Sequence, residues 1–185
     1  MPSGQKNKMT KKKARLSTRE IVVFAMLGCI CFLSKLLMEW APNIHLVGMF
    51  IMVYTLVYRK KALIPLYAYV LLIGIYYGFN TWWLPYLYIW TPLWGVTMLL
   101  PKNMPKKIAV PVYMAVCGLH GLCYGILYAP AQALLFGLNF KGMIAWIIAG
   151  LPFDALHGLG NLAAGVLVLP LTELLRKLER GIQKA

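Results

Sequence analysis

Long apolar stretches alternate with short polar or basic segments along almost the whole chain. A helix needs about 20 residues to cross the roughly 30 Å hydrocarbon core of a membrane, and apolar stretches of about that length recur through the sequence. The pattern predicts an all-α integral membrane protein with six transmembrane helices. The predicted spans are residues 20–38, 44–58, 62–77, 84–100, 108–128 and 150–171.

Local signals mark several of the span ends. Ser17, followed three positions later by Glu20, has the S-x-x-E form of a helix capping box. The second span is short for a full crossing, so we expect it to tilt, to thin the membrane or to be buried in protein. Residues 129–145 are moderately apolar and contain Gly, Pro and one Lys. Their pattern fits either a loop lying against the outer face or a short re-entrant helix.

Charge indicates the orientation of these spans. The chain of 185 residues is 61% apolar and has 19 Lys and Arg against 5 Asp and Glu, a net charge of +14. The basic residues fall in short clusters between apolar runs, at residues 1–19, 59–61, 102–107 and 176–185. By the positive-inside rule we expect cytoplasmic tails at 1–19 and 176–185 around a membrane domain at 20–175. Clusters of this kind form no basic face on a soluble domain, so we expect no nucleic-acid partner.

Recognisable catalytic and metal-binding motifs are missing from the sequence. Cys29, Cys31, Cys117 and Cys123 lie in apolar spans without a C-x-x-C pair, which indicates neither a disulfide framework nor a zinc site. There is no G-x-x-x-x-G-K-[ST], G-x-S-x-G or H-E-x-x-H motif. We therefore expect no enzymatic activity and no cofactor, and we expect ATP hydrolysis only from partner subunits.

A polar stripe interrupts the last apolar span. Asp154, His157 and Asn161 are spaced three and then four residues apart, which places them on one face of a helix. Ionisable groups inside a membrane span are costly and indicate a functional site, here a ligand or ion pocket. The structural alternative is that they join helices by hydrogen bonds. A metal site has little support, because only Asp154, His157 and His120 offer ligands and no metal-binding spacing accompanies them.

Other chemically distinctive residues fall at a similar depth. Counting about 1.5 Å per residue places His120 about 12 Å below the outer end of the fifth span, and Asp154 and His157 about 6 to 11 Å below that of the sixth. The sequence therefore predicts a pocket between spans four, five and six that opens outward. Its aromatic walls would be Tyr86, Trp90, Trp94 and Tyr124.

The aromatic residues also have a structural alternative. Tyr86, Trp90 and Trp94 recur at i, i+4 and i+8, which is typical of a packed helix face. His120 on an apolar span is more often a hydrogen-bonded core residue than a ligand. Glu39 and His45 flank the first outer loop and would either form part of a lid or be solvated.

Several features together resemble a known family. They are the basic N-terminal tail leading into a small-residue first span, VYRKKAL after a short second span, and the closing PFDALHGLGN and VLPLTELLRKL. With six spans in fewer than two hundred residues, the chain resembles the substrate-binding S components of energy-coupling-factor (ECF) vitamin transporters of bacteria and archaea. The resemblance covers nearly the whole chain.

The resemblance implies a multi-pass protein of the bacterial cell membrane that binds one vitamin or related small molecule near the outer face. It also implies a membrane scaffold subunit and two ATPase subunits as partners, outer loops one and three as a gate, and toppling of the chain to release its cargo inside. Family members dock through A-x-x-x-A in the first span, and the nearest equivalent here is Ala25 with Cys29, beside Gly28. Pro2 replaces the His of cobalt- and nickel-specific relatives, which argues against metal transport.

The ligand class follows from the residues of the predicted pocket. Because Asp154 is the only clear buried charge and the outer side has few basic residues, the pattern favours a flat, neutral or cationic heteroaromatic compound over a multiply anionic one. We expect Asp154→Asn and His157→Ala to abolish binding without unfolding the protein. The alternatives are a stand-alone secondary transporter, against which no internal repeat is visible, and an intramembrane enzyme that uses Asp154 and His157.

Overall fold

The computed structural model describes residues 16–182, and within that range every regular element is a helix. The α-helices are α1 (Thr18–Leu37), α2 (Val47–Tyr58), α3 (Leu63–Tyr77), α4 (Thr91–Leu99), α5 (Lys106–Leu122), α6 (Tyr124–Phe136), α7 (Phe140–Ala164) and α8 (Val168–Ile182). Three short 3-10 turns are η1 (Arg59–Ala62), η2 (Leu84–Leu87) and η3 (Gly165–Leu167). The predicted all-α class is confirmed for this range. Most of the predicted N-terminal tail, residues 1–15, and residues 183–185 lie outside it.

Three helical stretches in the described part of the chain are long and apolar enough to cross a membrane. They are α1 with 20 residues, the run of α5 and α6 from Lys106 to Phe136 with 31, and the run of α7 and α8 from Phe140 to Gly181 with 42. Helical stretches of this length and hydropathy are typical of membrane proteins. The count of six spans and the cytoplasmic location of both termini stay predictions.

The short helix α2 lies in the centre of the molecule. Its residues from Val47 to Leu56 are buried, except for the half-buried Phe50. A helix that is apolar on every side is suited to such an enclosed position. The Tyr54 hydroxyl donates a hydrogen bond of 2.9 Å to the Leu27 carbonyl of α1. Of the three explanations for the short second span, the structure supports burial in protein.

The predicted fourth span is not one helix. Residues 84–100 divide into η2 and α4, and Pro85 and Pro92 stand in the first turns of these two elements. Proline has no N–H to donate and a fixed φ, so it begins helices far more readily than it continues them. With 9 residues, α4 is only about 14 Å long and does not cross a membrane by itself. The prediction of a continuous span here is wrong, and Trp90 lies at the break.

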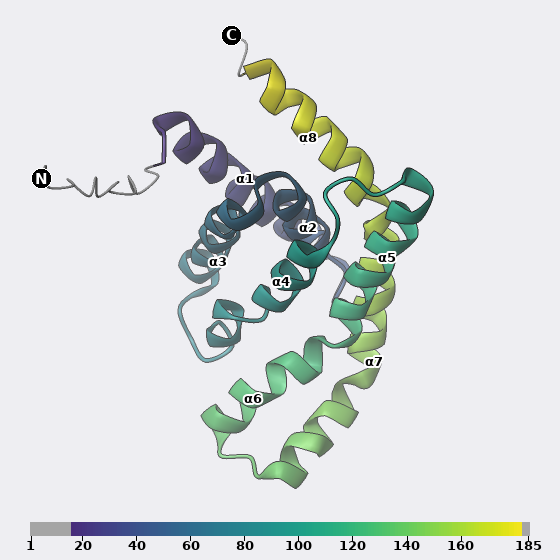
Figure 1. Cartoon of the computed structure of the whole chain (residues 1–185). Helices are drawn as coiled ribbons and strands as arrows, with labels where there is room; N and C mark the ends of the chain where they lie inside the picture. Colours follow the sequence, from purple (N-terminus) through teal and green to yellow (C-terminus); the bar gives the residue numbers. More distant parts are fainter. Residues whose placement is uncertain (1–15, 183–185) are drawn as a thin grey trace, which may run out of the picture.

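Residues 129–145 are mostly helical and contain the turn between two helices, so they are not a single loop. α6 continues to Phe136, Gly137 turns the chain with φ of 66°, and α7 begins at Phe140, ahead of the predicted start at Gly150. The Asn139 side chain caps α7 by accepting the Gly142 N–H at 2.9 Å. α6 and the first part of α7 make a helical hairpin at the end of the molecule opposite α8 (Figure 1).

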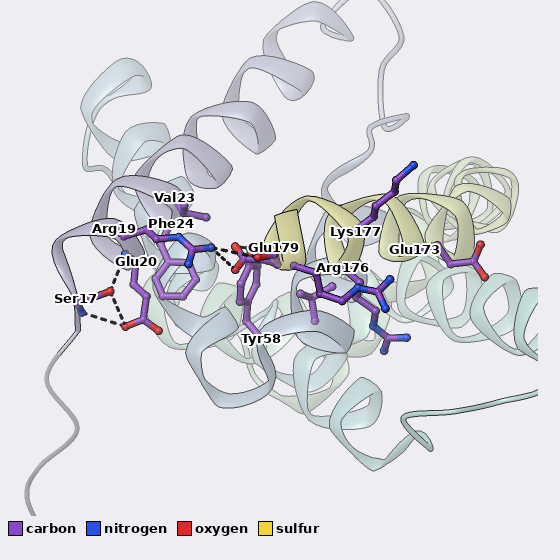
Figure 2. Close-up of a pocket in the computed structure, with 12 residues that line it drawn as sticks. Ser17, Arg19, Glu20, Val23, Phe24, Tyr58, Glu173, Arg176, Lys177 and Glu179 are labelled. Carbon is purple, nitrogen blue, oxygen red and sulfur yellow. Dashed lines mark hydrogen bonds and ion pairs between the residues drawn. The ribbon is translucent and has the colours of Figure 1, made fainter. Parts of the chain in front are cut away.

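Basic clusters that are far apart in the sequence meet at the other end. Glu179 of α8 pairs with Arg19 of α1 at 2.9 Å and accepts the Tyr58 hydroxyl of α2 at 2.7 Å (Figure 2). Further ion pairs join Lys61 to Glu20 and Lys106 to Glu173. We call this the basic end. The predicted capping box is confirmed, since the Ser17 hydroxyl accepts the Glu20 N–H and the Glu20 carboxylate accepts the Ser17 N–H.

The three predicted docking residues of α1 do not share one surface. Ala25 and Cys29 are exposed, whereas Gly28 is buried against α3. A Cβ atom at position 28 would lie 2.8 Å from the Ala68 Cβ and 3.2 Å from the Pro65 carbonyl oxygen. Gly28 therefore allows α1 and α3 to approach closely, and only Ala25 and Cys29 are accessible to a partner.

This packing predicts opposite outcomes for two neighbouring substitutions. Gly28→Leu should lower the free energy of unfolding by about 1–3 kcal/mol or more, because the added atoms overpack the contact between α1 and α3. Ala25→Leu, on the exposed face, should leave stability nearly unchanged. Thermal unfolding of the two purified variants in detergent measures the difference, and equal melting temperatures would contradict the close contact.

Candidate functional site

Trp90 is the centre of a group of aromatic and histidine side chains. It is 1% exposed, and its ring is 5.5 to 6.2 Å, between centroids, from five other rings. His157 joins the group through Tyr124, at 4.5 Å, and through His45, at 4.6 Å. We call these side chains the Trp90 cluster, whose members are His45, Tyr69, Tyr86, Trp90, His120, Tyr124 and His157.

The cluster unites distant parts of the chain. Its members come from α3, α5, α6, α7, η2, the segment before α2, and the break between η2 and α4. Of the predicted site residues it contains Tyr86, Trp90, Tyr124, His120 and His157. Sequence reasoning placed none of the pocket on α3 and so missed Tyr69, and it considered His45 only as part of a lid or as a solvated residue. No periodicity could indicate His45, because it lies outside the helices.

Several polar atoms in this cluster are buried without a hydrogen-bond partner among the described residues. They are His45 Nδ1, the Tyr69 hydroxyl, Trp90 Nε1, His120 Nδ1 and His157 Nε2. Buried polar groups in folded proteins are nearly always paired, so each exception needs an explanation. Five such atoms within one group of touching rings indicate a place where the polar groups of a ligand are received.

Two of these atoms have a defined hydrogen-bonding role. His120 Nε2 lies 2.9 Å from the Ile89 carbonyl oxygen. A carbonyl only accepts, so Nε2 carries the hydrogen, and Nδ1 of the neutral ring presents a lone pair. The indole Nε1 of Trp90 can only donate. The cluster thus offers at least one acceptor and one donor to a planar ligand.

Asp154 has a different role from the one its sequence position suggested. Both carboxylate oxygens accept the backbone N–H of Gly125, at 3.0 and 3.1 Å. Gly125 is in the first turn of α6, directly after the break between α5 and α6 at Cys123. A carboxylate is stabilised at a helix N-terminus, where N–H groups have no intrahelical partner. Asp154 therefore caps α6, and the predicted continuous span over 108–128 is broken at this point.

Asn161 lies one helical turn beyond His157, at the crossing of three helices. It is 1% exposed, and neither amide atom has a partner among the described residues. A Cβ at Gly48 of α2 would be 3.3 Å from Asn161 Oδ1, and one at Gly121 of α5 would be 2.8 Å from Nδ2. The two glycines enclose the amide tightly, one helical turn from His157 of the Trp90 cluster.

Trp94 is directed toward the basic end. Its indole N–H donates a hydrogen bond of 3.3 Å to the Arg59 carbonyl. None of the ring contacts of the cluster involves it. The structure therefore separates Trp94 from Trp90. The other predicted ring residues of the pocket, which do lie around Trp90, are Tyr86, His120, Tyr124 and His157.

Two cavities accompany this arrangement, one away from the cluster and one at its edge. One of about 1020 Å³ is at the basic end, between α1, α2 and α8 (Figure 2). The other, about 260 Å³, lies between α4 and α5 and has His120 on its wall. The rings of Tyr124 of α6 and His157 of α7 are in contact, with centroids 4.5 Å apart. Residues 16–182 contain no group of three His, Cys, Asp or Glu side chains arranged to hold a metal ion.

Comparisons with protein families, with curated proteins and with solved structures found no match to this chain. The family resemblance carried by the sequence motifs therefore stays a prediction, and the candidate site is defined by its own geometry.

The contact between Asp154 and Gly125 predicts the effect of adding one methyl group. A Cβ at Gly125 would lie 2.2 Å from Asp154 Oδ2, so Gly125→Ala should displace the carboxylate and lower the free energy of unfolding by about 1–3 kcal/mol. Gly150→Ala is the matched control, because no atom lies within 4 Å of that Cβ position. Thermal unfolding of both variants tests this, and an unaffected Gly125→Ala would refute the capping role.

Proposed function

We propose that this chain is the high-affinity substrate-binding subunit of an ECF-type importer in a bacterial cell membrane. Its substrate would be a vitamin or a related small heteroaromatic compound, and it would work with a scaffold subunit and two ATPase subunits. The observation that carries the proposal is the Trp90 cluster, in which five buried polar atoms without protein partners converge among aromatic rings. Few polar groups within aromatic walls are typical of small-molecule sites.

The hairpin of α6 and α7 supports a binding site that opens and closes. Tyr124 begins α6 directly after the helix break at Cys123, and His157 follows Asp154 on α7. Tyr128 of α6 donates to the Trp82 carbonyl at 2.9 Å, which holds the hairpin against the aromatic segment before α4. Movement of α6 about the break, with release of the contact between Asp154 and Gly125, would part Tyr124 from His157 and admit a ligand.

The exposed face of α1 supports a partner in the membrane. Ala25 and Cys29 are small, accessible and one helical turn apart, and such residues let two helices approach closely. Ile21, Met26 and Leu33 of the same helix are also exposed, so α1 presents further apolar surface. A scaffold helix could pack there, and energy for uptake would come from ATPases bound to that scaffold.

The two other hypotheses receive less support from the geometry. An intramembrane enzyme would depend on Asp154 and His157, but the Asp154 carboxylate is bonded to the α6 backbone. A secondary transporter would need an ion-coupling site, and a carboxylate that caps a helix is a poor candidate for one. Uptake into liposomes by the isolated chain under an ion gradient would support the secondary transporter instead.

Ligand binding should depend on Trp90 and not on Trp94. A stacking contact with an indole contributes about 1–3 kcal/mol, so Trp90→Leu should weaken binding by about 5- to 150-fold. His157→Ala should weaken it similarly, whereas Trp94→Leu should leave it unchanged. Native mass spectrometry of purified protein, followed by calorimetry with the molecule that co-purifies, measures the effect. Equal losses in the two tryptophan variants would contradict the site.

The partner proposal has a separate test. When the tagged chain is purified from its own cells, proteins with P-loop ATPase motifs and a second membrane subunit should be recovered with it. Ala25→Leu should reduce their recovery severalfold while the variant stays folded, because the larger side chain blocks close helix packing. If no ATPase is recovered with the parent chain and cells that contain it take up no ligand, the importer assignment is refuted.

A further inference from the structure

Lys35 is a cation close to the candidate site. It lies in the last turn of α1, at the end of the molecule opposite the basic end, and it is half-buried. Its ammonium lies 5.6 Å from the centre of the Tyr77 ring. Sequence reasoning did not identify Lys35, because it stands alone within an apolar span.

A series of aromatic rings connects Lys35 with the centre of the cluster. Tyr77, beneath the ammonium, is 5.9 Å from Trp82, which is 5.8 Å from Tyr86. Tyr86 in turn is 5.9 Å from Trp90. The Tyr77 hydroxyl is another buried polar atom without a partner among the described residues. An anionic group held at Lys35 would therefore place an attached ring against this series, which leads from Tyr77 toward Trp90.

No carboxylate neutralises Lys35 in the described part of the chain. The three ion pairs among residues 16–182 are all at the basic end. Glu39, four residues further on, is exposed and forms no ion pair with Lys35. Asp154 is committed to the Gly125 N–H. The local charge is therefore positive, which disfavours a cationic ligand and favours one negative group.

We propose that Lys35 binds the anionic group of the ligand and that the substrate is a planar heteroaromatic acid, such as a ring carboxylate. The inference rests on the proposed function and narrows its substrate class. The carboxylate pairs with the Lys35 ammonium, and the ring lies against the aromatic series that begins at Tyr77. It replaces the expectation of a neutral or cationic ligand, which depended on a free Asp154 charge.

Matched pairs of an acid and its amide test this inference, because the two members of a pair differ mainly in charge. The probes are pyridine-3-carboxylate with pyridine-3-carboxamide, and indole-3-acetate with indole-3-acetamide. Purified full-length protein is incubated with each pair at equal concentrations, and the retained molecules are quantified by mass spectrometry. The parent chain should retain an acid over its amide by about tenfold or more, because only the carboxylate forms a charge-assisted hydrogen bond with Lys35.

Variants separate recognition from a structural role of Lys35. Lys35→Gln should remove the preference for the acid, whereas Lys35→Arg, which also places a cation at the C-terminus of α1, should keep it. Lys141→Gln is the matched control, because Lys141 is an exposed lysine on the hairpin, outside the Trp90 cluster. Its preference should equal that of the parent chain.

Three results would overturn the inference: equal retention of acid and amide, an unchanged preference in Lys35→Gln, or retention of neither member of either pair. These results are distinguishable from failure of the proposed function. A chain that co-purifies with a scaffold and ATPases but does not prefer acids remains an importer subunit with a different substrate. A chain that prefers acids but recovers no ATPase binds the proposed ligand for another purpose.

Discussion

The backbone N–H of Gly125 has no helical partner, because the chain breaks between α5 and α6, and it lies in an apolar part of the molecule. An unpaired N–H in such surroundings costs several kcal/mol. Both oxygens of Asp154 receive it, at 3.0 and 3.1 Å. This contact joins α7 to the first turn of α6 and makes the bend possible. The bend in turn directs Tyr124 toward Trp90 and His157, so the composition of the cluster depends on it.

The two ends of the molecule are built from different interactions. At the basic end, ion pairs and a tyrosine hydroxyl connect α1, α2 and α8 around Glu179. At the opposite end, aromatic rings and histidines are in contact, and several of their polar atoms have no partner in the described chain. Ion pairs are suited to holding helices in fixed positions, whereas unpaired polar atoms among aromatic rings are suited to receiving a ligand. The proposed direction of transport runs between these ends.

The proposed ligand class depends on the charges near the Trp90 cluster. A buried carboxylate that is free would attract cations, but one that caps a helix has its charge balanced by backbone dipoles. With Asp154 engaged in this way, the remaining charge near the cluster is the ammonium of Lys35, held over Tyr77. Three histidine rings supply polarity without fixed charge. One residue's change of role, from ligand contact to helix cap, is thus the reason that the proposed substrate is an anion rather than a cation.

The sequence by itself determined the helical class, the capping box at Ser17 and Glu20, the basic clusters and the shared face of Asp154, His157 and Asn161. These features depend on composition and on periodicity within one segment. Only the tertiary structure decided that Asp154 meets Gly125, 29 positions away, that His45 reaches His157 and that Trp94 turns toward Arg59. Periodicity shows which residues share a face of their own helix, but proline breaks and glycine contacts between helices determine what that face meets.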